Sequence, residues 1–194
     1  GYWKGENPLA KIRQFKIQEK AMKYLTLDQI DRLLNEMKNG RNKDAHIIAR
    51  ICLTTGVRWS EAEELNTTQL QNGVIQFSMT KSGKNRAVPI DNELNAELNE
   101  IAKKSDSGRL FKYAASAFRD AIGRTGIELP AGQLTHVLRH TCASHFMMDG
   151  GNILILQRVL GHSSLAMTMK YAHLAPGHLQ ESLRLNPMAQ LNRR

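Results

Sequence analysis

The chain is poor in the residues that stabilise secreted and membrane proteins. Two cysteines, Cys52 and Cys142, occur in 194 residues, and both fall inside apolar helical patterns. We therefore expect buried free thiols of a cytosolic protein and no disulfide framework. No apolar run approaches the roughly 20 residues that a membrane-spanning helix requires, which excludes a membrane span.

Acidic residues are also scarce relative to basic ones. There are 27 Lys and Arg against 18 Asp and Glu, which gives a net charge of +9. At 41% hydrophobic residues the chain has enough apolar content for a folded core. A folded domain this basic favours a polyanionic partner, with nucleic acid as the first choice. The chain begins with Gly1 and shows no signal peptide, which indicates a piece of a longer protein.

Hydrophobic spacing and capping residues predict a mainly helical domain with one small antiparallel sheet. Residues 1–23 carry six Lys or Arg against two Glu, which indicates a basic linker or arm. A capping box at Thr26–Gln29 predicts a first helix that ends at Asn39-Gly40, and a second helix should stop at Gly56. Apolar and polar residues alternate over residues 75–79, and residues 87–90 follow a turn-rich basic stretch. Together they predict a β-hairpin with a basic tip.

After the hairpin the chain is expected to be helical again, in one α+β domain. Apolar stripes predict helices after Asp91 and around Phe118. Four more helices are expected, each bounded by Gly, Asn, Ser or Pro, at Leu134–Met148, Asn152–Leu160, Ser163–Ala172 and Pro176–Leu185.

An arginine follows the end of the second predicted helix, in Thr55-Gly56-Val57-Arg58-Trp59-Ser60-Glu61. Ser60 to Glu63 suggests a capping box that opens a short third helix. A helix N-terminus attracts anions, and Arg58 would add a planar, bidentate phosphate clamp. Taken alone, Arg58 is better explained as a solvated surface arginine. Glu61 and Glu63 are expected to serve the N-terminus of that helix.

Three histidines occur in the helix predicted from Leu134. His136 and Arg139 share a face, as do His136 and His140. A zinc site made of His136, His140 and His145 is rejected, because Val137 stands where a zinc helix of this spacing has glutamate and no other ligand cluster is evident. His140 and His145 are expected to be structural, each bonded to the backbone.

A third motif is Leu160-Gly161-His162-Ser163-Ser164, followed by Tyr171-Ala172-His173. Gly161 should end one helix and Ser163 or Ser164 should cap the next, so that His162 lies in the turn with its ring facing a ligand. Tyr171 would then fall about two turns into the next helix. Taken alone, Tyr171 would be a core or surface tyrosine, and nothing in its spacing indicates a further role.

Together these motifs resemble those of the tyrosine recombinase (phage integrase) family, over about Met22 to Ala175, and most of all those of integrases of temperate tailed phages or prophages. The family pattern is Arg in Gly-x-Arg-x-Ser-Glu, Lys at a hairpin, His-x-x-Arg-His, Gly-His-Ser and then Tyr. The matching residues here, in order, are Arg58, Lys81, His136, Arg139, His162 and Tyr171.

The resemblance implies an enzyme that breaks and rejoins DNA without metal, cofactor or ATP. Tyr171 would attack a phosphodiester to give a 3′-phosphotyrosine, with His136 as the candidate for its proton. Arg58, Arg139 and His162 would stabilise the charge on the phosphate oxygens. Lys81 would protonate the leaving 5′-oxygen, and Lys84 competes for that role by position alone.

The resemblance also implies partners and an assembly. The substrate would be double-stranded DNA at attachment sites in the cytoplasm of a bacterial host, bound by a tetramer with accessory DNA-bending proteins. Residues 24–175 would form the catalytic domain, preceded in family members by arm-binding and core-binding domains. Residues 176–194 would form a tail exchanged between subunits. The alternatives are a non-catalytic helical DNA-binding protein and a type IB topoisomerase-like strand transferase.

Overall fold

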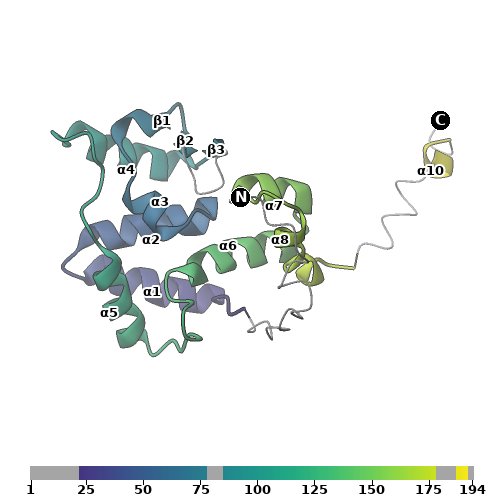
Figure 1. Cartoon of the computed structure of the whole chain (residues 1–194), viewed down its shortest axis with the longest axis horizontal. Coiled ribbons are helices and arrows are strands. Elements are labelled where there is room, and N and C mark those ends of the chain that lie inside the picture. Colours follow the sequence, from purple (N-terminus) through teal and green to yellow (C-terminus); the bar gives the residue numbers. More distant parts are fainter. Residues whose placement is uncertain (1–21, 78–84, 178–186, 192–194) are drawn as a thin grey trace, which may run out of the picture.

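The computed structural model describes residues 22–77, 85–177 and 187–191, and shows helices around one small sheet (Figure 1). The predicted α+β class is therefore confirmed. The helices are α1 (Leu27–Asn39), α2 (Lys43–Thr55), α3 (Trp59–Glu63), α4 (Asn92–Lys103), α5 (Ala115–Thr125), α6 (His136–Met148), α7 (Ile153–Leu160), α8 (Ala166–Met169) and α10 (Pro187–Leu191). Short 3₁₀ turns occupy Thr67–Gln69 and Ala172–Leu174.

Helix α1 begins and ends where its capping residues predict, and α2 ends at the predicted glycine. Thr26 caps α1 in a capping box with Gln29, and Gly40 follows its end. Asn42 caps α2, and Gly56 ends it in the left-handed conformation at φ 62°. Gly56 also has no room for a side chain, because a Cβ there would come within 2.6 Å of Cδ2 of Leu160. The end of α2 is thus packed directly against the end of α7.

The hairpin is part of a three-stranded antiparallel sheet. Strand β2 (Val74–Phe77) pairs with β3 (Arg86–Pro89), with Ile75 opposite Val88. Strand β1 (Leu70–Gln71) pairs with β2 and was not predicted, since two residues give no measurable alternation. The predicted basic tip of the hairpin lies outside the described residues.

Most of the core lies between α2 and its neighbours. Helix α2 packs against α1, α5 and α6, and its buried side chains include Ile48, Ile51 and Cys52. Cys52 and Cys142 are free thiols, but Cys142 is only half-buried. None of the described helices is long and apolar enough to cross a membrane.

The C-terminal helices differ most from prediction. The helix expected over Ser163–Ala172 is one turn, α8, and its N-cap is Leu165 without a side-chain cap bond, so Ser163 and Ser164 do not cap it. Tyr171 follows α8 in a turn. Pro176 and Gly177 are not helical, and the rest of the helix expected to Leu185 lies outside the described residues, as does most of the basic arm. Helix α10 was not predicted.

Candidate active site

Arg139 joins the two chain segments that carry Arg58 and His162. It lies on α6 with 4% of its surface exposed. Its Nη1 donates to the carbonyl oxygen of Gly56 and its Nη2 to that of Leu160, both at 2.8 Å. We call this pair of bonds the Arg139 junction. Because Gly56 ends α2 and Leu160 ends α7, the junction satisfies carbonyls that helix ends leave unpaired. It also places Arg58 and His162 on either side of Arg139.

Arg58 is held by Glu61. Arg58 is the N-cap of α3, where its backbone N–H donates to Oε2 of Glu61 at 3.1 Å and its Nη1 to Oε1 at 3.3 Å. The predicted cap at Ser60 is therefore wrong, although Glu61 does serve the helix N-terminus. The Arg58 side chain remains 30% exposed, so it can still reach a ligand.

Arg86, on β3, is the second partner of Glu61 and was not singled out by the sequence. Its Nη2 donates to Oε2 of Glu61 at 2.9 Å, and its guanidinium stacks 5.0 Å from the ring centre of Phe77. Its Nη1 lies against Gly161, where a Cβ would clash. Arg86 thus links the sheet to Glu61 and to the turn that carries His162.

Glu63 does not serve the N-terminus of α3, contrary to expectation. It lies at the end of that helix and accepts hydrogen bonds from Nε1 of Trp59 at 3.0 Å and from the backbone N–H of Ala114 at 2.8 Å. Glu63 therefore fixes α3 to the segment before α5. The Trp59 ring packs against Phe118 in a tilted arrangement, with 4.9 Å between the ring centres.

His162 lies in the turn after α7, as predicted, but its ring is not free. Gly161 ends α7 at φ 67°, and His162 is only 6% exposed. Its Nδ1 is 2.8 Å from Oγ1 of Thr168 on α8. This bond fixes the ring, so that Nε2 is the nitrogen left for a ligand.

Tyr171 is fully buried and is hydrogen-bonded to His140. Its Oη lies 2.8 Å from Nδ1 of His140 on α6, and the Tyr171 side chain packs with Met147, Leu156 and Leu160. The sequence predicted a structural His140 bonded to backbone, whereas the structure places it against the phenol. His145 does bond backbone, with Nε2 at 2.8 Å from the carbonyl oxygen of Leu25.

Five of the six predicted residues lie close enough together to influence one another's charge, so the fold places them in one cluster. The pKa of His162 is lowered to about 4 by burial and then by Arg139, Lys170, Arg58 and Arg86. The pKa of His136, an exposed residue at the start of α6, is lowered by desolvation, by Arg58 and by Arg139. Tyr171 is in electrostatic reach of Arg139. Lys81, the sixth residue, lies outside the described residues, as does Lys84.

The cluster carries a concentrated positive charge. Burial and the neighbouring Arg58 and Arg86 lower the pKa of Arg139 to about 10. Burial opposes ionisation of Glu61, but Arg86 and Arg58 outweigh it and lower its pKa. Glu61 thus supplies one negative charge among at least three cationic side chains. Such a site has a strong preference for an anion, and a phosphate fits the planar guanidinium groups.

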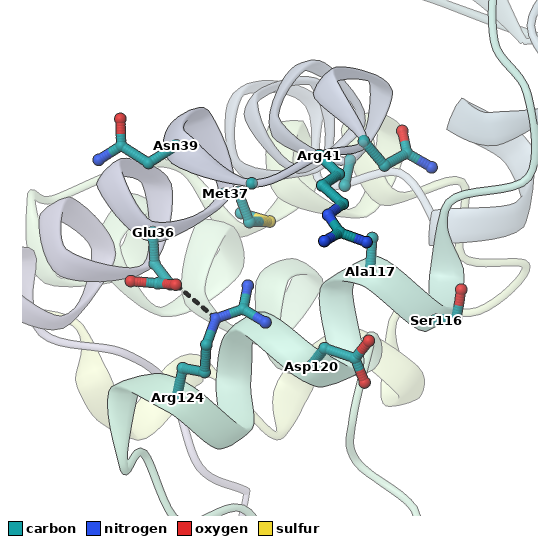
Figure 2. Close-up of a pocket in the computed structure, with 11 residues that line it drawn as sticks. Glu36, Met37, Asn39, Arg41, Ser116, Ala117, Asp120 and Arg124 are labelled. Atoms are coloured by element: carbon teal, nitrogen blue, oxygen red, sulfur yellow. Dashed lines mark hydrogen bonds and ion pairs between the residues drawn. The ribbon is translucent and has the colours of Figure 1, made fainter.

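The described residues contain no group of three or more His, Cys, Asp or Glu side chains able to hold a metal ion. A separate pocket of about 520 Å³ lies between the end of α1, the start of α2 and α5 (Figure 2). An ion pair joins Glu36 and Arg124 across it, beside Arg41 and Asp120. None of the six predicted residues lines this pocket, so it is distinct from the cluster around Tyr171.

The fold and the cluster together define a helical domain with a cationic, phosphate-type site next to a buried tyrosine. Residues 23–178 match the family model described as the phage integrase family. The chain belongs to this family.

Named relatives and solved structures agree with this assignment. The chain is 56% identical over 191 residues to the integrase of Escherichia phage 186, covering 98% of this chain and 56% of that protein. It is 53% identical to the integrase of Haemophilus phage HP1, covering 96% of this chain and 54% of that protein. The chain therefore spans about half the length of these relatives.

Two structural matches show the fold. The catalytic domain of bacteriophage HP1 integrase superimposes with a TM-score of 0.81 at 53% identity, covering 87% of this chain and 98% of that domain. A Tn1549 transposon integrase in complex with transposon right-end DNA gives a TM-score of 0.71 at 22% identity, covering 93% of this chain and 70% of the other. The predicted fold is thus confirmed as that of a tyrosine recombinase catalytic domain.

Proposed function

We propose that the chain is the catalytic domain of a site-specific DNA recombinase that cleaves and rejoins DNA through a 3′-phosphotyrosine. The observation that carries this proposal is the convergence of Arg58, Arg139 and His162 beside Tyr171, arranged by the Arg139 junction. A cationic site next to a phenol suits attack of the phenol on a phosphodiester.

The proposed roles follow from the groups that each residue offers. Tyr171 is the nucleophile, and its Oη forms the bond to phosphorus as the bond to the 5′-oxygen breaks. Arg58, together with the remaining N–H groups of Arg139 and Nε2 of His162, donates to the phosphate oxygens. Preorganised donors of this kind contribute about 10²–10³ in rate each. His136 adds a hydrogen bond from the exposed side of α6.

Proton transfer needs an acceptor for the phenol and a donor for the leaving group. The pKa of Tyr171 is raised to about 12, mainly by burial, so the phenol cannot ionise by itself at neutral pH. The sequence suggested His136 as the acceptor, whereas the contact observed is with His140. Lys81 is proposed as the donor on the strength of the family pattern alone. These side chains leave no step that requires a metal ion or ATP.

The proposed substrate is double-stranded DNA, and the proposed assembly is a tetramer on DNA in the bacterial cytoplasm. The net charge of +9 and the DNA bound to the Tn1549 integrase support DNA as the ligand. Accessory DNA-bending proteins remain part of the proposal. Residues 1–23 are proposed as an arm, although Lys23 donates a hydrogen bond to Gln133 and so packs on the domain.

Residues 176–194 are proposed to pack on a second subunit. Met188 and Leu191 of α10 are 62% and 58% exposed, and short helices need a surface to cover. Apolar side chains on and near α7 and α8 offer such a surface on a second copy, namely Leu154, Ile155, Leu165, Met167 and Met169. Light scattering of the chain cut after Ala175, free and on DNA, tests this directly. Unchanged assembly would contradict it.

Covalent capture tests the proposed function and identifies the target sequence in the same experiment. The chain is incubated with a library of nicked duplexes of randomised sequence, and DNA that stays on protein in SDS is sequenced. We expect adducts with the parent and none with Tyr171→Phe, in the presence of excess EDTA. No adduct from the parent would favour a non-catalytic DNA-binding protein, and activity restored only by Mg²⁺ would contradict the mechanism.

The same material separates a recombinase from a topoisomerase. Once a captured sequence is known, a recombinase requires it, whereas a type IB topoisomerase relaxes supercoiled plasmids that lack it. We expect plasmid relaxation only when the captured sequence is present.

A further inference from the structure

The contact between Tyr171 and His140 has a definite direction. Tyr171 is fully buried, and Nδ1 of His140 is the hydrogen-bond partner of its Oη among the described residues. A buried phenol must donate its proton, because an O–H without an acceptor in the interior is costly. Nδ1 of His140 therefore accepts, and the ring proton of the neutral imidazole is on Nε2.

We propose that His140 is a further catalytic residue, which accepts the phenolic proton of Tyr171 as the phenol attacks phosphorus. This inference rests on the proposed function. It assigns to His140 the proton transfer that sequence had suggested for His136. His136 is left on the exposed side of α6, near Arg58 and Arg139, where a phosphate can reach it.

The surroundings keep His140 in the accepting form. Burial, and then the charges of Lys170, His136 and Arg139, lower the pKa of His140 to about 4. The ammonium of Lys170 lies 5.2 Å from the centre of the Tyr171 ring, and Cys142 and Arg139 are the other titratable groups near the phenol. At neutral pH the imidazole is therefore uncharged, with Nδ1 free to take a proton.

The step balances. The Oη–H bond breaks and its proton moves to Nδ1, which makes His140 an imidazolium. The Oη–P bond forms, the bond from phosphorus to the 5′-oxygen breaks, and that oxygen takes a proton from the general acid, proposed above as Lys81. On rejoining, the 5′-hydroxyl gives its proton back to the general acid and attacks phosphorus, the Oη–P bond breaks, and His140 returns its proton to Oη.

Two substitutions separate proton acceptance from hydrogen bonding. His140→Leu removes both, whereas His140→Asn places an amide oxygen near the position of Nδ1 that accepts a hydrogen bond but takes no proton at these pH values. His145→Leu is the matched control. It is a histidine of the same helix with one 2.8 Å bond, to the carbonyl oxygen of Leu25 and away from the phenol. Melting curves confirm that each variant is folded at the assay temperature.

The kinetic readout is single-turnover adduct formation on a duplex recovered by covalent capture, with sulfur replacing the 5′-bridging oxygen. A thiolate leaves without a proton, so the pH profile reports the nucleophile alone. We expect a rate for the parent and His145→Leu that is flat between pH 6 and 8. His140→Leu should lose about 10²-fold or more. The rate of His140→Asn should rise about tenfold per pH unit, as the phenolate fraction does below its pKa.

Contrary results are equally clear. A His140→Leu rate within threefold of the His145→Leu control, or one faster than the parent, would overturn the proposal. The faster rate would mean that the contact restrains the tyrosine. A flat pH profile for His140→Asn would also overturn it.

A second measurement reads the contact without any reaction. Long-range ¹H–¹⁵N spectra of histidine-labelled protein should show His140 as the Nε2–H tautomer at neutral pH, with altered nitrogen shifts in Tyr171→Phe. An Nδ1–H tautomer, or no change in Tyr171→Phe, would overturn the inference. Absence of adducts from the parent would instead count against the proposed function, with the contact still decided by these spectra.

Discussion

Arg86 places its Nη2 2.9 Å from Oε2 of Glu61, and the same oxygen accepts the backbone N–H of Arg58. One carboxylate therefore connects a strand of the sheet to the arginine proposed to bind phosphate. The side chains of Arg86 and Glu61 are 6% and 17% exposed, so this ion pair is screened little by solvent.

Removal of Arg86 should affect both stability and cleavage. Arg86→Gln leaves Glu61 as a partly buried charge, and breaking a buried pair on one side costs about 3 kcal/mol. We expect a lower melting temperature and slower adduct formation, because Glu61 is then free to draw Arg58 away from the phosphate. Lys103→Gln breaks the Lys103–Glu100 pair, whose side chains are 70% and 60% exposed, and should leave stability nearly unchanged because solvent screens such a pair. Equal effects of the two variants would contradict the role of Arg86.

Thr168 should matter through His162. Thr168→Val keeps the shape of the side chain but removes the hydroxyl 2.8 Å from Nδ1 of His162. The ring is then free to rotate or to change tautomer, and the loss of one orienting bond corresponds to about a tenfold slower reaction. When both are measured in parallel, the rate of adduct formation should fall while the DNA affinity stays unchanged. A parent-like rate would show that packing alone orients His162.

Gly56 should tolerate alanine much less well than Gly126, although both end helices in the left-handed region. Their φ values are 62° and 67°, so the conformational strain is matched. A Cβ at Gly56 would lie 2.6 Å from Cδ2 of Leu160, whereas a Cβ at Gly126 meets nothing within 4 Å. Gly126→Ala should cost about 1 kcal/mol, while Gly56→Ala adds an overpacking cost of about 1–3 kcal/mol. Urea unfolding measures both, and equal losses would show that α7 yields without penalty.

Acidification should destabilise the domain in a defined pH window. Burial is the main cause that lowers the pKa values of His140 and His162 to about 4, against about 6.5 in an unfolded chain. Between these values the unfolded chain binds more protons, so stability falls as the pH drops from 6.5 toward 4. The melting temperature should be level above neutral pH and decline below it. A melting temperature that rises on acidification would contradict the buried, neutral histidines.

Much of the fold could be read from local sequence. Thr26 with Gln29, and Asp91, are short-range signals, and each caps the helix whose start it predicts. Strand β1 and the single turn of α8 could not be read, because such short elements exist through contacts with distant segments. The caps expected at Ser60 and Ser163 or Ser164 failed for a related reason. Glu61 pairs with the backbone N–H of Arg58 and so starts α3 earlier than Ser60, and the side chain of Thr168 on α8 is bonded to His162.

The candidate site was predictable in its motifs but not in its supporting contacts. Nothing in the spacing places Arg86 on Glu61, since 25 residues and a strand pairing separate them. The bond from His140 to Tyr171 spans 31 residues and depends on how α6 packs on the chain after α8. The sequence offered one clue, since His140 follows Arg139 directly and so lies on the next face of the same helix.

The Arg139 junction makes one guanidinium serve folding and phosphate binding together. Removing Arg139 would leave the carbonyls of Gly56 and Leu160 unpaired, at about 1–3 kcal/mol each, so an inactive Arg139→Ala protein could be inactive because it is unfolded. By the same linkage, any anion bound between Arg58 and His162 stabilises the ends of α2 and α7 as well. The melting temperature of the protein is therefore a direct titration signal for occupancy of the site, readable before any DNA strand is cut.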